Sequence, residues 1–183
     1  MTSSNPCTQN DEPSSQLKQR LERLGAREIG LWKEMVLQDE SLFPQIYHLM
    51  FCNHPKLAWH SAWVIDHVSE VQPQLLEPLL PDLIGHLPGL KNSSLKRHFT
   101  RMLLSQKIPE NEMGTLVDVL YDLLSPAEPV AVRANALQLL YNISLIEPDL
   151  QPELISVTES ILEEDLTPGL LSKSKKILSR LKR

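Results

Sequence analysis

PVAVRANALQLL, residues 129–140, is the stretch that decides the fold of this chain. Pro129 suits the first turn of a helix, because proline there loses no helical hydrogen bond. Apolar residues then occupy nearly the whole circumference of a helix over residues 130–146. Such a helix has to be covered on more than one side. The stretch therefore predicts a helix packed among other helices.

Two other stretches align with residues 131–139 and reveal a repeat. They are LAWHSAWVI, residues 57–65, and LKRHFTRML, residues 95–103, at successive offsets of 38 and 36 residues. The first column of the alignment holds Trp59, Arg97 and Arg133. A small-residue column holds Ala62, Thr100 and Ala136. An apolar column holds Ile65, Leu103 and Leu139. A fourth copy falls near residues 170–178. A period of about 36–40 residues with two helices per unit is typical of an α-solenoid.

Apolar residues recur at helical spacing along most of the chain, and Pro and polar clusters separate the runs. The predicted helices cover residues 14–24, 27–38, 41–52, 56–71, 76–87, 93–106, 111–125, 130–146, 150–164 and 168–182. Pro78 and Pro81 fit the run over 76–87 only if that helix begins close to them. The composition agrees with an all-α protein, since 34 leucines stand against 6 glycines and no Asn-Gly or Asp-Gly hairpin pair occurs.

The N-terminus predicts a tail and a cellular compartment. Residues 1–13 are polar and rich in Pro and Ser, which indicates a disordered tail ahead of a single domain over 14–183. The start resembles no signal peptide, and no run of about 18 apolar residues occurs. Cys7 and Cys52 show no paired spacing and are expected to be free thiols. We therefore predict a cytoplasmic protein with no membrane association.

The net charge of −5 is unevenly distributed. Residues 166–183 hold six of the 18 basic residues and none of the 23 acidic ones, so the rest of the chain carries a formal −11. An acidic body disfavours a long groove that follows a phosphate backbone. The basic tip has two readings: it complements the dipole of a last helix, or it meets an anionic partner.

The stretch from Pro129 to Leu140 resembles the second helix of a HEAT repeat. That pattern places Pro in the turn and then Val-Arg, Ala-Leu and Leu, which are here Pro129, Val132, Arg133, Ala136, Leu137 and Leu140. HPKLAWHSAW keeps the Pro and the Ala but has Trp59 at the Arg position, and residues 93–106 keep Arg97 but have Thr100 for Ala. The resemblance covers about residues 40–183. It implies an α-solenoid of about four helix pairs with an N-terminal capping helix, as in short bacterial HEAT-like proteins.

ALQLLYNIS also resembles the third helix of an armadillo repeat, whose Asn grips an extended peptide backbone. Asn142 stands at the matching place. The equivalent positions in the other copies hold Gln106 and Val68, so the ladder of successive Asn residues is missing. Asn142 is therefore either a peptide contact or a residue whose side chain makes a helix-end hydrogen bond.

No constellation of residues predicts catalysis, a cofactor or a metal. His60 and His67 are seven residues apart and lack the close spacing of a metal pair, and no Cys-x-x-Cys occurs.

Two enzyme activities come into question because HEAT-like sequences can carry their names. Adenylosuccinate lyase activity is not indicated, because the Ser-Ser-x-Met-Pro loop of that enzyme is absent. Trp59, Trp63 and Asp66 resemble the aromatic residues and Asp that HEAT-like DNA alkylation-repair glycosylases use, but that group also needs a basic wall.

We predict a non-enzymatic scaffold that binds a protein or peptide on the concave face of the repeat array. The candidate binding residues are Trp59, Trp63, Lys96, Arg97, Arg101, Arg133 and Asn142. The Arg column either bonds neighbouring turns or presents donors to a ligand. The alternative is a nucleic-acid protein that acts through the basic tip or as the glycosylase above. We expect a monomer or a weak dimer.

Overall fold

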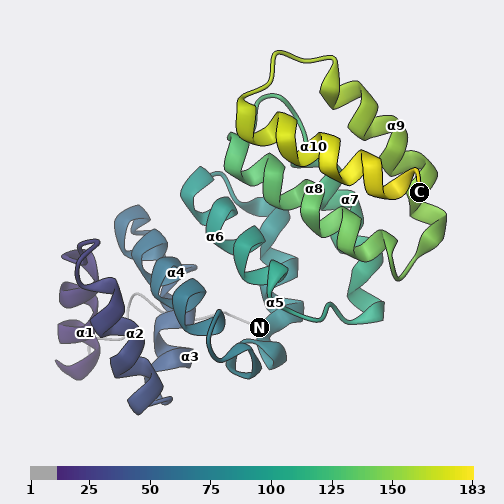
Figure 1. The fold of residues 1–183 in the computed structure, drawn as a ribbon. Helices are drawn as coiled ribbons and strands as arrows, with labels where there is room; N and C mark the ends of the chain where they lie inside the picture. Colours follow the sequence, from purple (N-terminus) through teal and green to yellow (C-terminus); the bar gives the residue numbers. More distant parts are fainter. Residues whose placement is uncertain (1–11) are drawn as a thin grey trace. The chain divides into compact units, whose positions relative to one another are not determined.

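The computed structural model describes residues 12–183, which contain ten α-helices and no strand. The predicted all-α solenoid class is confirmed (Figure 1). The helices are α1 (Glu12–Glu22), α2 (Ile29–Gln38), α3 (Leu42–Leu49), α4 (Pro55–Ser69), α5 (Leu80–His86), α6 (Ser93–Leu104), α7 (Glu110–Asp122), α8 (Val130–Ser144), α9 (Gln151–Leu162) and α10 (Pro168–Leu181). Residues 1–11, and with them Cys7 and most of the predicted tail, lie outside the described part of the chain.

Each predicted helix is present, and most ends agree within a few residues. The main difference is α5, which is shorter than the predicted 76–87. Glu77–Leu79 forms a short 3-10 turn instead, and α5 begins at Leu80. Two prolines explain this start, because Pro78 and Pro81 each lack the N–H that an α-helix interior needs and are tolerated only near a first turn.

The chain forms two compact units. The N-terminal unit comprises the chain up to Leu80 together with Leu90–Gln106, and the C-terminal unit comprises Pro81–Gly89 together with Lys107–Arg183. In the N-terminal unit, α4 is central and packs against α1, α2, α3 and α6. In the C-terminal unit, α8 packs against α7, α9 and α10, and α10 also packs on α9 (Figure 1). Whether residues 14–183 act as one domain stays a prediction.

The repeat register seen in the sequence matches the burial of side chains. The small-residue column is fully buried, with no exposure at Ala62, Thr100 or Ala136. The apolar column is buried as well, at Ile65, Leu103 and Leu139. Small side chains let neighbouring helices approach closely, and the apolar ones fill the space between them.

His60 fastens the first helix to the central one. Its ring lies buried on α4, and its Nδ1–H donates to the backbone carbonyl of Leu21 at 2.6 Å. A carbonyl oxygen only accepts, so this bond fixes the proton on Nδ1. Burial lowers the pKa of His60 below its ordinary value of 6.5, and the nearby Lys56 acts in the same direction. Burial therefore favours the neutral form of this imidazole in the folded chain.

We expect the stability of the N-terminal unit to fall as the pH drops below about 6.5. Below that pH the unfolded chain binds a proton at His60 more readily than the folded chain does, because folding lowers the pKa of this histidine. A lower pH therefore stabilises the unfolded chain relative to the folded one. Burial also lowers the pKa of His67, so the two effects share a sign. Urea unfolding followed by tryptophan fluorescence at several pH values measures this. The pH dependence should shrink but persist in His60→Gln, and an unchanged dependence in that variant would contradict the assignment.

Candidate functional site

The central helix α4 leaves a single stripe of its surface uncovered. Every side chain from Leu57 to Ser69 is buried except those of Trp59, Trp63 and His67. These three residues are spaced four apart, so they share one face of the helix. We call Trp59, Trp63 and His67 the aromatic stripe.

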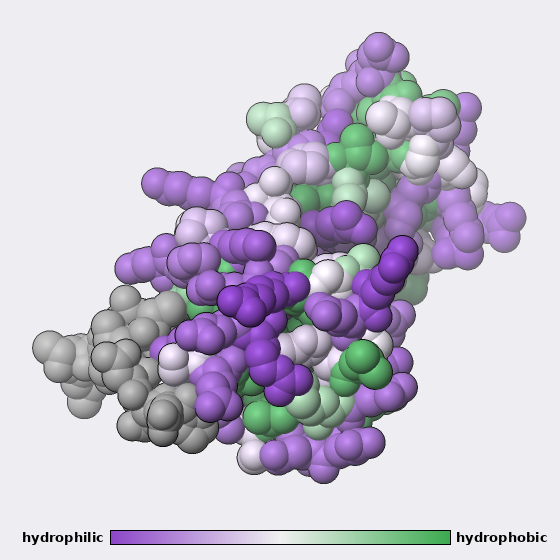
Figure 2. Space-filling view, turned by 90° about the vertical axis from the view of Figure 1, so that its left-hand side faces the viewer, coloured by the Kyte–Doolittle hydropathy of each residue, from purple (hydrophilic) through white to green (hydrophobic). Residues whose placement is uncertain are grey.

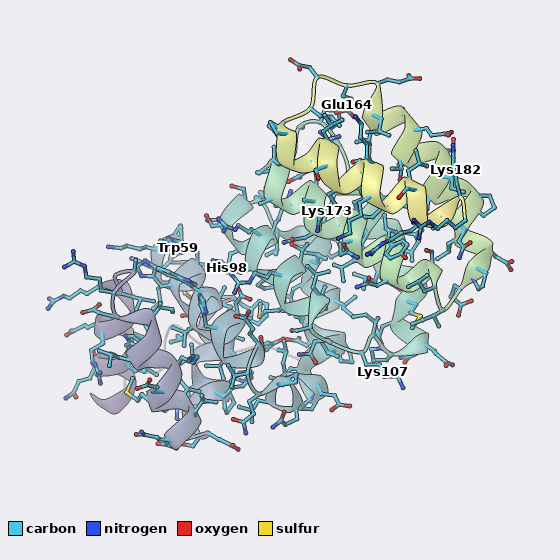
Figure 3. All side chains as sticks on the ribbon, in the orientation of Figure 1. Trp59, His98, Lys107, Glu164, Lys173 and Lys182 are labelled. Atoms are coloured by element: carbon cyan, nitrogen blue, oxygen red, sulfur yellow. The ribbon has the colours of Figure 1, made fainter. Side chains whose placement is uncertain are left out.

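The two tryptophans of the aromatic stripe stack on each other. Their ring centroids are 5.7 Å apart with an interplanar angle of 22°. The ring of His67 continues the row at 6.4 Å from Trp63. Stacking limits the rotamers of the large side chains, so the stripe offers a broad apolar surface at a small entropic cost on binding. Figure 3 labels Trp59 on this helix.

Helix α6 lies against α4 and supplies basic side chains. Asn92 fixes where α6 begins, because its Oδ1 accepts from the backbone N–H groups of Ser94 and Leu95. From this start, Lys96 is half-buried, Arg97 is exposed and Arg101 is about one-third exposed, at 34%. The structure therefore brings five of the seven candidate residues together on two neighbouring helices.

A buried carboxylate ties α4 to α6. Asp66 is 2% exposed, accepts a hydrogen bond from the Nδ1–H of His98 at 2.8 Å and forms an ion pair with Nε of Arg101 at 3.3 Å. The other end of the Arg101 guanidinium reaches Glu70 at 3.0 Å. In Figure 3, His98 lies between the two helices. Asp66 is thus buried and paired with two side chains, whereas a carboxylate that acts on a substrate needs to be accessible to it.

Arg133 is buried and bonded to two other residues within the C-terminal unit. Its side chain is 6% exposed, Nε donates to the backbone carbonyl of Leu124 at 2.8 Å, and its guanidinium reaches Glu164 at 2.8 Å. Of the two readings of the Arg column, the bond to a neighbouring turn is the one seen at this position. Arg97, in the same column, is exposed. The column therefore does not form one uniform surface.

Asn142 is exposed on α8, and its Oδ1 accepts from Nε2 of Gln138 at 3.0 Å. This hydrogen bond joins two side chains near the end of α8, and a peptide contact by Asn142 stays a prediction. Beside it, the guanidinium of Arg180 lies over the ring of Tyr141 at 5.9 Å. The contact between Arg180 and Tyr141 joins α8 to the basic α10.

Sequence reasoning missed the polar ties between helices. Each joins residues about one repeat apart, as in Asp66 with His98, Glu70 with Arg101, and Arg133 with Glu164. Opposite charges at a spacing of 31 to 35 residues were the available signal. Repeat proteins are stabilised by contacts between neighbouring units, so such pairs belong to the repeat itself.

Large apolar side chains are rarely exposed on the N-terminal unit. Leu31 and Val71 are more than half exposed, and Trp59 and Trp63 are half-buried. Figure 2, seen from the side of α1 and α2, shows mainly hydrophilic side chains with scattered hydrophobic ones. Within residues 12–183, no three His, Cys, Asp or Glu side chains converge as metal ligands would, and Cys52 is a buried free thiol.

Comparison with protein families identifies a repeat domain in this chain. A family model described as a HEAT repeat domain matches residues 14–181. No curated protein and no solved structure matches the chain. None of the helices between residues 12 and 183 is long and apolar enough to span a bilayer.

Proposed function

Because the chain belongs to the HEAT repeat family, we propose that it is a non-enzymatic scaffold that binds a protein or peptide segment on the uncovered face of α4 and α6. Helical repeat arrays present extended surfaces, since each unit packs only on its neighbours. A cytoplasmic location and a monomeric or weakly dimeric state complete the proposal.

The aromatic stripe is the observation that carries the proposal. Helix α4 is buried on all its other sides, and its remaining side carries two stacked tryptophans. The fold therefore leaves part of the apolar surface of these two rings unburied. Tryptophan and arginine are the residue types that dominate binding energy in protein interfaces. Trp59, Trp63 and Arg101 supply both types on adjacent helices.

The partner segment should be apolar at one position and acidic nearby. An apolar or aromatic side chain would lie on the rings of Trp59 and Trp63, and a carboxylate would meet Lys96 and Arg97. Arg101 is already shared by Asp66 and Glu70, so it contributes more to placing the surface than to adding charge. These basic groups are partly exposed to water, so each charge pair should add little to the affinity. Their larger effect should be to orient the partner segment on the surface.

Removing the tryptophan rings should abolish most of the binding. We expect the double variant Trp59→Ala, Trp63→Ala to retain about one-tenth or less of the wild-type capture of a partner, because the main apolar contact is lost. Cross-linking of the tagged chain in cell extract with quantification of each partner measures this. Leu31→Ala is the matched control, since Leu31 is an exposed apolar residue elsewhere on the unit. Partners captured equally by all three proteins would show that the stripe does not bind them.

The rival hypothesis is nucleic-acid binding by α10. Lys173, Lys176 and Arg180 are spaced three and four residues apart, so they share one stripe of that helix. Binding of labelled duplex and single-stranded DNA at several salt concentrations separates the hypotheses, because phosphate contacts weaken steeply with salt. The rival is favoured if DNA binding is salt-sensitive and is lost when the charges of Lys173, Lys176 and Arg180 are reversed. Replacing Trp59 and Trp63 should then leave DNA binding unchanged.

A further inference from the structure

The C-terminal unit contains an open groove that the sequence did not indicate. It has a volume of about 510 Å³ and runs between α7 and the turn that follows α8. Its apolar lining is made by Met113 and Val117 of α7, Ile143 of α8 and Leu150 beyond it. The first three of these side chains are at least nine-tenths buried, so the groove has a firm apolar floor.

Four carboxylates surround this floor. Glu110 and Asp118 stand on α7, and Glu147 and Asp149 stand on the turn after α8. All four are exposed, and no basic group within residues 12–183 pairs with any of them. Like charges around one opening repel each other, and a cation placed there relieves the repulsion. The groove is therefore apolar at its base and negative at its rim.

Gly114 lines the groove without adding a side chain to it. It lies in the interior of α7, where glycine is among the least favourable residues. No atom lies within 4 Å of the position that a Cβ would take, so packing within the unit does not require a glycine there. A larger residue would be accommodated by the helix and would project into the groove that Gly114 lines.

We propose that this groove docks a basic amphipathic segment of a partner protein, independently of the aromatic stripe. An apolar side chain of the segment enters the groove and rests on Met113, Val117 and Ile143. Lysine or arginine residues on either side of it meet the carboxylates of the rim. Charge complementarity selects this occupant, because an acidic or phosphorylated segment would be repelled and a neutral one would leave the rim unpaired.

The test uses two synthetic peptides of equal length with leucines at helical spacing, one filled with lysines and the other with glutamates. Titration of the fluorescently labelled peptides with the full chain gives the dissociation constants. We expect the lysine peptide to bind and the glutamate peptide not to bind. Gly114→Leu should weaken the lysine peptide at least tenfold, which corresponds to about 1.4 kcal/mol. Its unfolding midpoint should stay at or above that of the wild type, because leucine favours the helix.

Two controls separate docking from general attraction to an acidic protein. Gly30→Leu makes the same change in α2, where a Cβ also meets nothing within 4 Å, and should bind as the wild type does. Asp118→Lys should weaken binding, whereas Glu163→Lys, an exposed acid of the same unit outside the groove, should alter it by no more than about twofold.

Several outcomes would overturn the proposal. It fails if the lysine peptide does not bind, if Gly114→Leu binds it unchanged, or if Glu163→Lys weakens it as much as Asp118→Lys does. It also fails if sedimentation shows that the wild-type chain self-associates and that Gly114→Leu abolishes this, because the occupant is then a second copy of the chain. None of these results depends on the aromatic stripe, so the proposed scaffold function stands or falls separately.

Discussion

Replacing Arg133 by alanine is expected to lower the free energy of unfolding of the C-terminal unit by about 3 kcal/mol. The Arg133 side chain is 6% exposed, so folding removes its guanidinium from water. The carbonyl of Leu124 and the carboxylate of Glu164 compensate for that loss. Truncation leaves that carbonyl without its side-chain donor and opens a space where the arginine stem packed. Glu164 is 30% exposed and can turn to water, which keeps the loss below that of a fully enclosed pair.

Arg97→Ala is the control for this prediction, because Arg97 occupies the same column of the repeat but is exposed. We expect it to change stability by no more than about 0.5 kcal/mol. Urea unfolding followed by circular dichroism reports all the helices, whereas Trp32, Trp59 and Trp63 report the N-terminal unit alone. A loss in Arg133→Ala no larger than that in Arg97→Ala would show that the buried ion pair contributes nothing net.

The helices could be predicted from the sequence because their signals are local. Apolar spacing and proline positions act within a few turns, and the described chain contains each predicted helix. The repeat register was also accessible, since small residues at Ala62, Thr100 and Ala136 recur at similar offsets of 38 and 36 residues and are all fully buried. The largest shift is at the start of α5, and the two nearby prolines account for it.

The roles of the polar residues could not be predicted in the same way, because they depend on contacts between helices. Arg97 and Arg133 share a column, yet one is exposed and the other is buried. The difference arises from Leu124 and Glu164, which offer acceptors around Arg133 and stand nine and 31 residues away from it. The groove at Gly114 was missed for a similar reason, since its two walls come from α7 and from the end of α8 with the turn that follows it.

Replacing Asp66 by alanine is expected to destabilise the N-terminal unit by about 3–4 kcal/mol. Asp66 is 2% exposed, and its removal leaves the buried Nδ1–H of His98 without an acceptor. Arg101 keeps Glu70 as a partner but loses the contact that holds its Nε at 3.3 Å. The loss should be visible by tryptophan fluorescence during urea unfolding, because all three tryptophans belong to this unit.

The variants Glu70→Ala and Asp66→Asn distinguish a structural role of Asp66 from a role in binding. Glu70 is 61% exposed, so its removal should cost no more than about 1 kcal/mol even though it also binds Arg101. Asp66→Asn keeps the shape and one acceptor, so its loss should fall between those of the other two variants. If Asp66 only ties α4 to α6, partner capture by folded Asp66→Asn should match that of the wild type. Full stability combined with lost partner capture would instead place the Asp66 carboxylate in the binding surface itself, beside Trp63.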